Sequence, residues 1–178
     1  MTTPDPVAQL KFPIGPFTAQ EHIDKTELGS LIETVASAPV RYRALTSNLT
    51  DKDLQRTYRE GSWNIQQLVN HVADMQMLHF FRMKKALTES DYSATLVNMD
   101  GWASTADGLF SSVGDSLDMF ASITKRYVYL MRSLDEQQLG VSYYHAVRKS
   151  TFNQKQAISM SAWHVRHHLE HIRIALGN

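Results

Sequence analysis

The chain has 178 residues, a length that suits one domain with a sizeable core. Its 18 Lys and Arg balance 18 Asp and Glu, so the formal net charge is zero and gives no reason to expect a nucleic-acid or membrane-surface partner. No apolar run approaches the roughly 18 residues of a membrane span, and the N-terminus lacks the basic start of a signal peptide. The expected location is therefore cytoplasmic. Cysteine is absent, which excludes disulfides, thiolate metal sites and a cysteine nucleophile.

Residues 1–23 are rich in proline and glycine, so they predict an extended arm and exclude a helix. Apolar side chains should tie this arm to the core: Leu10, Phe12, Ile14 and Phe17. A helix should begin near Asp24, because Asp24-Lys-Thr-Glu27 has the form of a capping box. Pro39 should then break or kink that helix.

Three further helices are predicted from apolar residues at helical spacing. They span about residues 63–87 after an N-cap at Ser62, residues 117–134, and the C-terminal segment opened by a capping box at Asn153. Residues 88–114 should form a long loop with room for a turn of helix, and residues 135–151 a small β-hairpin. Four substantial helices with long connections predict an all-α fold, a four-helix bundle formed by residues 1–178 as a single domain.

The segment from residue 162 to residue 172 holds four of the eight histidines. At about 100° per residue, His164, His168 and His171 lie within about 60° of one another on the last helix, beside its apolar stripe. His167 should point further toward solvent. Two imidazoles at positions i and i+4 of one helix face can bind one metal ion. A third ligand must then come from another part of the chain.

His71 is the candidate for that third ligand, because it borders the apolar stripe of the helix at residues 63–87. A bundle that packs this helix against the last one brings His71 together with His164 and His168. Three histidines with open coordination positions are typical of a catalytic metal site rather than a structural one. Geometry alone leaves His171 as a competitor for either ligand on the last helix, or as a residue that supports one.

Three stretches together resemble one protein family. They are Phe12-Pro-Ile-Gly-Pro-Phe17, the run from Tyr58-Arg-Glu-Gly-Ser-Trp to Val-Asn-His71, and Trp163-His164 followed by His168-Leu-x-His-Ile. In this order and spacing they resemble the YfiT-like branch of the DinB superfamily, over almost the whole chain.

The resemblance implies a four-helix bundle with one divalent metal ion, zinc or nickel, held by His71, His164 and His168. It also implies a metal-dependent hydrolase that acts on a small molecule. The alternatives are a transferase that uses a low-molecular-weight thiol such as bacillithiol, or a metal-binding bundle without catalysis. Members of this branch are often homodimers.

Asp74 follows His71 by one helical turn and is a candidate general base or imidazole partner, although a solubilising charge explains it equally well. His79 should be buried and hydrogen-bonded to backbone. Trp63, Trp102 and Trp163 should be packing residues. The sequence contains no Glu-x-x-His and no His-Glu-x-x-His, which disfavours a ferritin-type di-iron site and a zincin protease.

Overall fold

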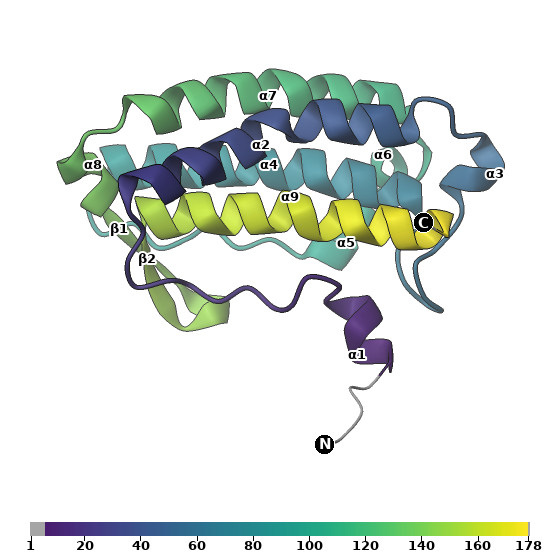
Figure 1. The fold of residues 1–178 in the computed structure, drawn as a ribbon, viewed down its shortest axis with the longest axis horizontal. Coiled ribbons are helices and arrows are strands. Elements are labelled where there is room, and N and C mark those ends of the chain that lie inside the picture. The colour runs from purple at the N-terminus through teal and green to yellow at the C-terminus, as the bar shows by residue number, and fades with distance from the viewer. Residues whose placement is uncertain (1–5, 178) are drawn as a thin grey trace.

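A computed structural model describes residues 6–177 of the chain, and four long helices dominate it (Figure 1). They are α2 (Lys25–Thr46), α4 (Ile65–Thr88), α7 (Val113–Ser133) and α9 (Gln154–Leu176). The predicted all-α four-helix bundle is therefore confirmed. No helix within residues 6–177 is both long enough and apolar enough to cross a membrane.

The four long helices pack in the cyclic order α2, α7, α4, α9. Helix α2 contacts α7 and α9, and α4 contacts the same two helices, so α2 and α4 occupy opposite corners of the bundle. The colours in Figure 1 show that α2 and α9 run in one direction and α4 and α7 in the other. This order makes α4 and α9, the two histidine-bearing helices, antiparallel neighbours.

Short elements fill the connections between the long helices. The helical ones are α1 (Pro6–Lys11), α3 (Asp51–Leu54), α5 (Met99–Ala103), α6 (Ala106–Phe110), α8 (Glu136–Gly140) and a 3₁₀ turn at Ala146–Arg148. Strands β1 (Ser142–His145) and β2 (Ser150–Asn153) pair in antiparallel register with Tyr143 opposite Phe152, which confirms the predicted hairpin. The predicted loop at residues 88–114 holds the two short helices α5 and α6.

Helix α4 begins two residues later than the sequence predicts. Asn64, rather than Ser62, is the N-cap: its side chain accepts from the Gln67 amide, and the Gln67 side chain accepts from the Asn64 amide. The Ser62 hydroxyl instead donates to the Arg59 carbonyl, closing the turn before the helix. Two reciprocal hydrogen bonds satisfy more of the unpaired helix-end amides than one serine hydroxyl does. The capping box at Asn153 forms as predicted.

Pro39 does not break α2, which continues through it from residue 25 to residue 46. The proline lies on the buried face of the helix, and packing of that face against α7 and α9 offsets a cost of about 3 kcal/mol for an interior proline. At the start of α2, Asp24 caps the Glu27 amide as expected. The Glu27 carboxylate does not close the box, because it accepts from the Gln20 side chain instead.

Of the arm predicted at residues 1–23, residues 1–5 lie outside the described part of the chain. The remainder, residues 6–23, is not extended throughout, because α1 forms at Pro6–Lys11. The prediction that proline excludes a helix here was wrong, since a proline at the first helical position has no intrahelical N–H to lose. After α1 the chain turns at Gly15, whose φ of +78° favours glycine. The Trp163 indole donates to the Gly15 carbonyl over 3.1 Å, so the arm is tied to α9.

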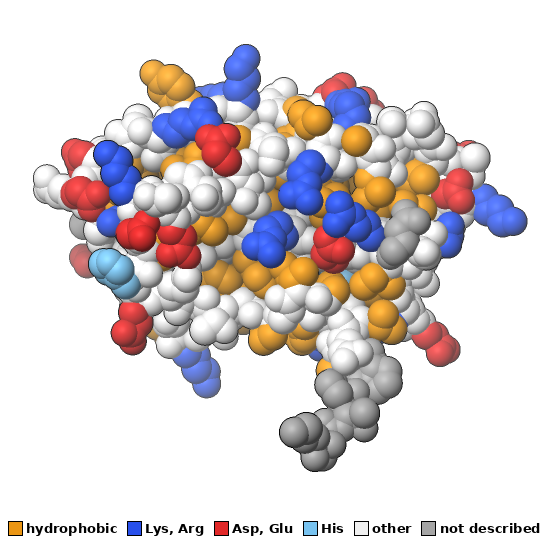
Figure 2. All heavy atoms as spheres, in the orientation of Figure 1, with side chains coloured by type: hydrophobic (Ala, Val, Ile, Leu, Met, Phe, Trp, Pro, Cys, Tyr) orange, Lys and Arg blue, Asp and Glu red, His pale blue; other side chains and the backbone are white. Residues whose placement is uncertain are grey.

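Charges of both signs are interspersed on the face of the molecule shown in Figure 2, as the zero net charge leads one to expect. Beneath this surface the buried apolar residues form separate clusters, two of which lie toward opposite ends of the bundle. At one end α2, α4, α7 and α9 contribute residues such as Tyr42, Val72, Phe120 and Leu169. At the other end Val35, Met83, Tyr127 and Ile158 pack together.

The substitution Tyr42→Phe tests the core contact between α2 and α9. The Tyr42 side chain is fully buried, and its hydroxyl donates to the Val165 carbonyl over 2.8 Å. Loss of this hydrogen bond should lower the free energy of unfolding by about 1 kcal/mol, measured by urea denaturation. Tyr129, which is 79% exposed, offers a matched Tyr→Phe control that should change nothing. Equal stability of both variants would show that the buried hydroxyl does not stabilise the fold.

Candidate metal centre

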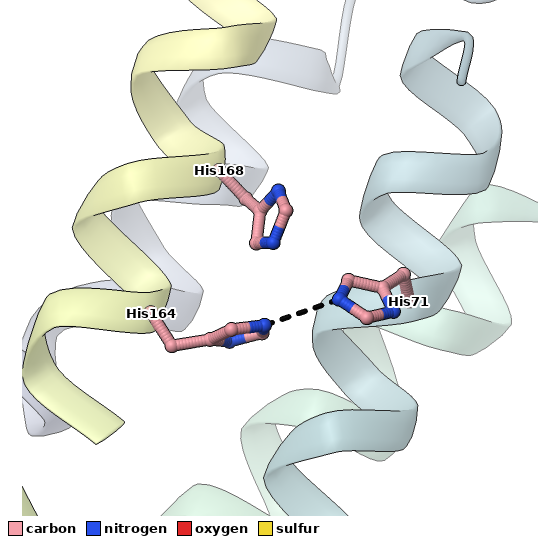
Figure 3. Close-up of side chains that lie close together, drawn as sticks. All are labelled: His71, His164 and His168. Atoms are coloured by element: carbon pink, nitrogen blue, oxygen red, sulfur yellow. Dashed lines mark hydrogen bonds between the residues drawn. The ribbon is translucent and has the colours of Figure 1, made fainter. Parts of the chain in front are cut away.

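Three histidines meet where α4 faces α9, and we call them the three-histidine site: His71, His164 and His168. Figure 3 shows His71 projecting from α4 toward the two histidines one turn apart on α9. The Nε2 atoms of His71 and His164 are 3.1 Å apart, and one ring nitrogen from each residue lies within 4.8 Å of the others. All three side chains are buried.

These distances suit a metal ion. Zinc–nitrogen bonds of 2.0–2.1 Å at tetrahedral angles place two ligand nitrogens about 3.3 Å apart. The His71–His164 separation of 3.1 Å is close to this value, and a ring nitrogen of His168 lies within 4.8 Å of the other two. A set of imidazoles without carboxylate or thiolate suits zinc, copper, iron or nickel better than magnesium or calcium.

Burial keeps these imidazoles neutral, which is the form that binds metal. It lowers the pKa of His71 to about 3, and it lowers the pKa of both His164 and His168 well below the ordinary value. The imidazoles also depress one another, because charging one would place it beside the next. At neutral pH each ring therefore offers an unprotonated nitrogen.

Aromatic side chains surround the histidines. The Trp63 ring lies 4.7 Å from that of His71, and Tyr58 stacks on His171 at 3.8 Å with an interplanar angle of 12°. Trp163 stacks on His167 at 4.3 Å. The predicted packing roles of Trp63 and Trp163 are thus confirmed. The stacking role of Tyr58 was not predicted, although Tyr58 opens the motif that ends at His71.

His167 is 5% exposed rather than solvated, so the prediction for it was wrong. The N-terminal arm covers the side of α9 that carries His167, and the Phe12 ring lies 6.0 Å from the His167 ring. Together with His168 and His171 it forms a second buried histidine group among the described residues. In this group the Nδ1 atoms of His168 and His171 are 3.2 Å apart.

His79 is buried, as predicted, but its partner is a side chain rather than backbone. Its Nδ1 lies 3.1 Å from the Ser161 hydroxyl, which also contacts the Tyr127 hydroxyl at 3.2 Å. The His79 ring lies 5.4 Å from that of His164. Ser161 precedes His164 by three residues and so shares its helix face, a spacing that could have identified this neighbour.

Asp74 lies on another side of α4. It lines two hollows formed with residues of α5, α6 and α7. Among the described residues, His71, His164 and His168 line neither hollow. Burial and the nearby Asp107 carboxylate raise the pKa of Asp74 to about 6. Trp102 lines one of these hollows and is partly exposed.

Comparison with known proteins agrees with this architecture. Residues 35–172 match the DinB superfamily. A protein of Bacillus pumilus (strain SAFR-032) named "Putative metal-dependent hydrolase" is 34% identical over 166 residues, covering 93% of this chain and 94% of the relative. "Putative metal-dependent hydrolase YfiT" of Bacillus subtilis (strain 168) is 29% identical over 163 residues, covering 92% of each chain.

Two solved structures share the fold. YfiT from Bacillus subtilis, described as a probable metal-dependent hydrolase with an unusual four-helix bundle topology, superposes with a TM-score of 0.91 at 28% identity, covering 94% of this chain and 95% of its own. A mycothiol-dependent maleylpyruvate isomerase superposes with a TM-score of 0.67 at 14% identity over 82% of this chain and 60% of its own, a likeness of fold alone. The chain therefore belongs to the YfiT-like branch of the DinB superfamily.

Proposed function

We propose that this protein is a metal-dependent hydrolase whose divalent ion is held by His71, His164 and His168. The observation that carries the proposal is the convergence of three buried, neutral imidazoles from two helices at chelating distance. The curated relatives in Bacillus species are named for the same activity.

The chain's own residues would bind and enclose the ion. The three imidazoles would leave coordination positions for a small substrate. Trp63, which lies beside His71, and Tyr58, which stacks on His171, would limit the access of water. When bound, the ion supplies Lewis acidity that brings the pKa of a water molecule or thiol toward neutrality. Asp74 faces other hollows, so we assign it no part in proton transfer.

Metal content is the first test of the site. Protein purified without an affinity tag should carry about one divalent ion per chain by elemental analysis, because three imidazoles form one site. His71→Ala should lose most of that ion, whereas His22→Ala, a change at an exposed histidine, should retain it. Full retention of metal by His71→Ala would remove His71 from the site.

The reaction class needs a second experiment with the metal-loaded protein. One panel of esters and amides tests hydrolysis, and one panel of low-molecular-weight thiols with a chloro-nitroaromatic acceptor tests thiol transfer. We expect turnover in the first panel that disappears in His71→Ala. Turnover confined to the thiol panel would assign a transferase, and metal binding without turnover in either panel would favour a bundle that only binds metal.

A further inference from the structure

The two ring nitrogens of His168 face different neighbours. Figure 3 shows one nitrogen directed toward His71 and His164 and the other directed away from them. The outward atom is Nδ1, which lies 3.2 Å from Nδ1 of His171. The inward atom is therefore Nε2, the nitrogen available to the three-histidine site.

Counting protons assigns the tautomers of this pair. A neutral imidazole carries one N–H. If Nε2 of His168 binds the ion, its single proton must sit on Nδ1, so His168 donates and Nδ1 of His171 accepts. The proton of His171 then lies on Nε2, which is buried and makes no hydrogen bond of standard geometry. The backbone of Leu10 and Lys11, at the end of α1, lies near this ring.

The surroundings of His171 hold its ring in place for this contact. The side chain is 2% exposed, and its ring is stacked on Tyr58 at 3.8 Å. On the same side of α9 the arm reaches Trp163 through the Gly15 carbonyl. The His171 ring therefore packs between Tyr58, in the segment before α4, and the N-terminal arm.

Given the proposed three-histidine site, on which this step rests, we infer that His171 is a positioning residue. By accepting the Nδ1–H hydrogen bond of His168, it fixes the tautomer and ring orientation that present Nε2 to the metal ion. A hydrogen-bonded partner of this kind also raises the basicity of a ligand imidazole.

The same residues could be read as a second metal site made of His167, His168 and His171. That reading requires Nδ1 of His168 to be unprotonated while its Nε2 serves the first site, so His168 would have to become an imidazolate. It also needs room for further ligands, whereas Tyr58, Trp163 and Phe12 pack against this group. A hydrogen bond between His168 and His171 requires neither an imidazolate nor room for further ligands.

Two substitutions at residue 171 separate positioning from packing. His171→Phe keeps a flat ring against Tyr58 but removes both nitrogens. His171→Asn loses the ring but places an amide oxygen on Cγ, where Nδ1 was, so it retains the acceptor. His167→Phe is the matched control, because it changes an equally buried histidine one turn earlier that lies outside the three-histidine site.

The zinc dissociation constant, measured by competition with a chelating indicator, is the main readout. We expect His171→Phe to bind zinc about 10–100-fold more weakly, with His171→Asn and His167→Phe within about threefold of the parent protein. Parent-like binding by His171→Phe would overturn the inference. Complete zinc loss in both variants at residue 171 would also overturn the inference, because it would make His171 a ligand. Two zinc ions per parent chain would overturn it as well and would establish the second site instead.

A tautomer measurement on the unaltered protein complements these variants and does not depend on their folding. Long-range ¹H–¹⁵N correlation spectra of the zinc-loaded protein should place the His168 proton on Nδ1 and the His171 proton on Nε2. A proton on Nδ1 of His171 would overturn the inference. Failure of the three-histidine site itself would appear differently, as parent-like zinc binding in His71→Ala.

Discussion

Removal of the divalent ion should lower the melting temperature of this protein by about 8–16 °C. The three proposed ligands come from α4 and α9, so the folded chain should bind the ion, whereas the unfolded chain does not hold these histidines together. Free metal at a thousandfold excess over its dissociation constant stabilises the folded state by about 4 kcal/mol. In a chain of this size each kcal/mol changes the melting temperature by about 2–4 °C.

The measurement is a pair of thermal unfolding curves, with zinc and with chelator, followed by far-ultraviolet circular dichroism. His71→Ala serves as the internal control, because without the α4 ligand its two curves should nearly coincide. Equal melting temperatures of the zinc-loaded and zinc-free parent protein, with metal loss proven, would mean that the bundle gains no stability from the site.

Acid should unfold the metal-free protein between about pH 6 and pH 5. Burial lowers the pKa of seven histidines, His145 among them. The other six carry the effect, because their pKa falls to about 3 for His71, His79 and His167, to about 4 for His171, and well below 6.5 for His164 and His168. In the unfolded chain each returns to about 6.5. Below that pH the unfolded chain binds more protons than the folded chain, so the free energy of unfolding falls as pH falls.

The size of the effect comes from the number of histidines. Each one contributes about 1.4 kcal/mol per pH unit between its two pKa values. Six together contribute about 8 kcal/mol per unit, against a total stability of about 5–15 kcal/mol for a typical domain. Protonation of Asp74 has the opposite effect on the free energy of unfolding, because its pKa is raised to about 6 in the folded chain. This single carboxyl group offsets only a small part of the effect of the six histidines.

A pH titration of helix content in chelator measures this transition. Retention of full helix content at pH 4 would contradict the buried, neutral state of these histidines. With zinc present, metal release should coincide with loss of helix, because protons compete with zinc for His71 in the folded chain only near pH 3. Release of zinc from a fully helical protein at pH 6 would contradict that order of events.

Helix positions and caps could be predicted from the sequence because they depend on nearby residues. Apolar spacing located the four long helices, and Asn153 with Gln156 forms its capping box from residues three apart. The errors also have local causes. Ser62 and Asn64 are both good N-caps, and only hydrogen bonding to Gln67 distinguishes them.

The pairing of His164 and His168 was likewise determined by the sequence, because positions i and i+4 face the same way on any α-helix. Helical periodicity gives the direction of a side chain around the axis of its helix. It does not say which other segment of the chain covers that side of the helix. The packing of α4 against α9 brings His71 to the pair, and the arm buries His167. The 3.2 Å contact between His171 and His168, on which the proposed supporting role of His171 rests, depends on ring orientation. Only the tertiary structure decides that orientation, through the stacking of Tyr58 and the neighbouring backbone of α1.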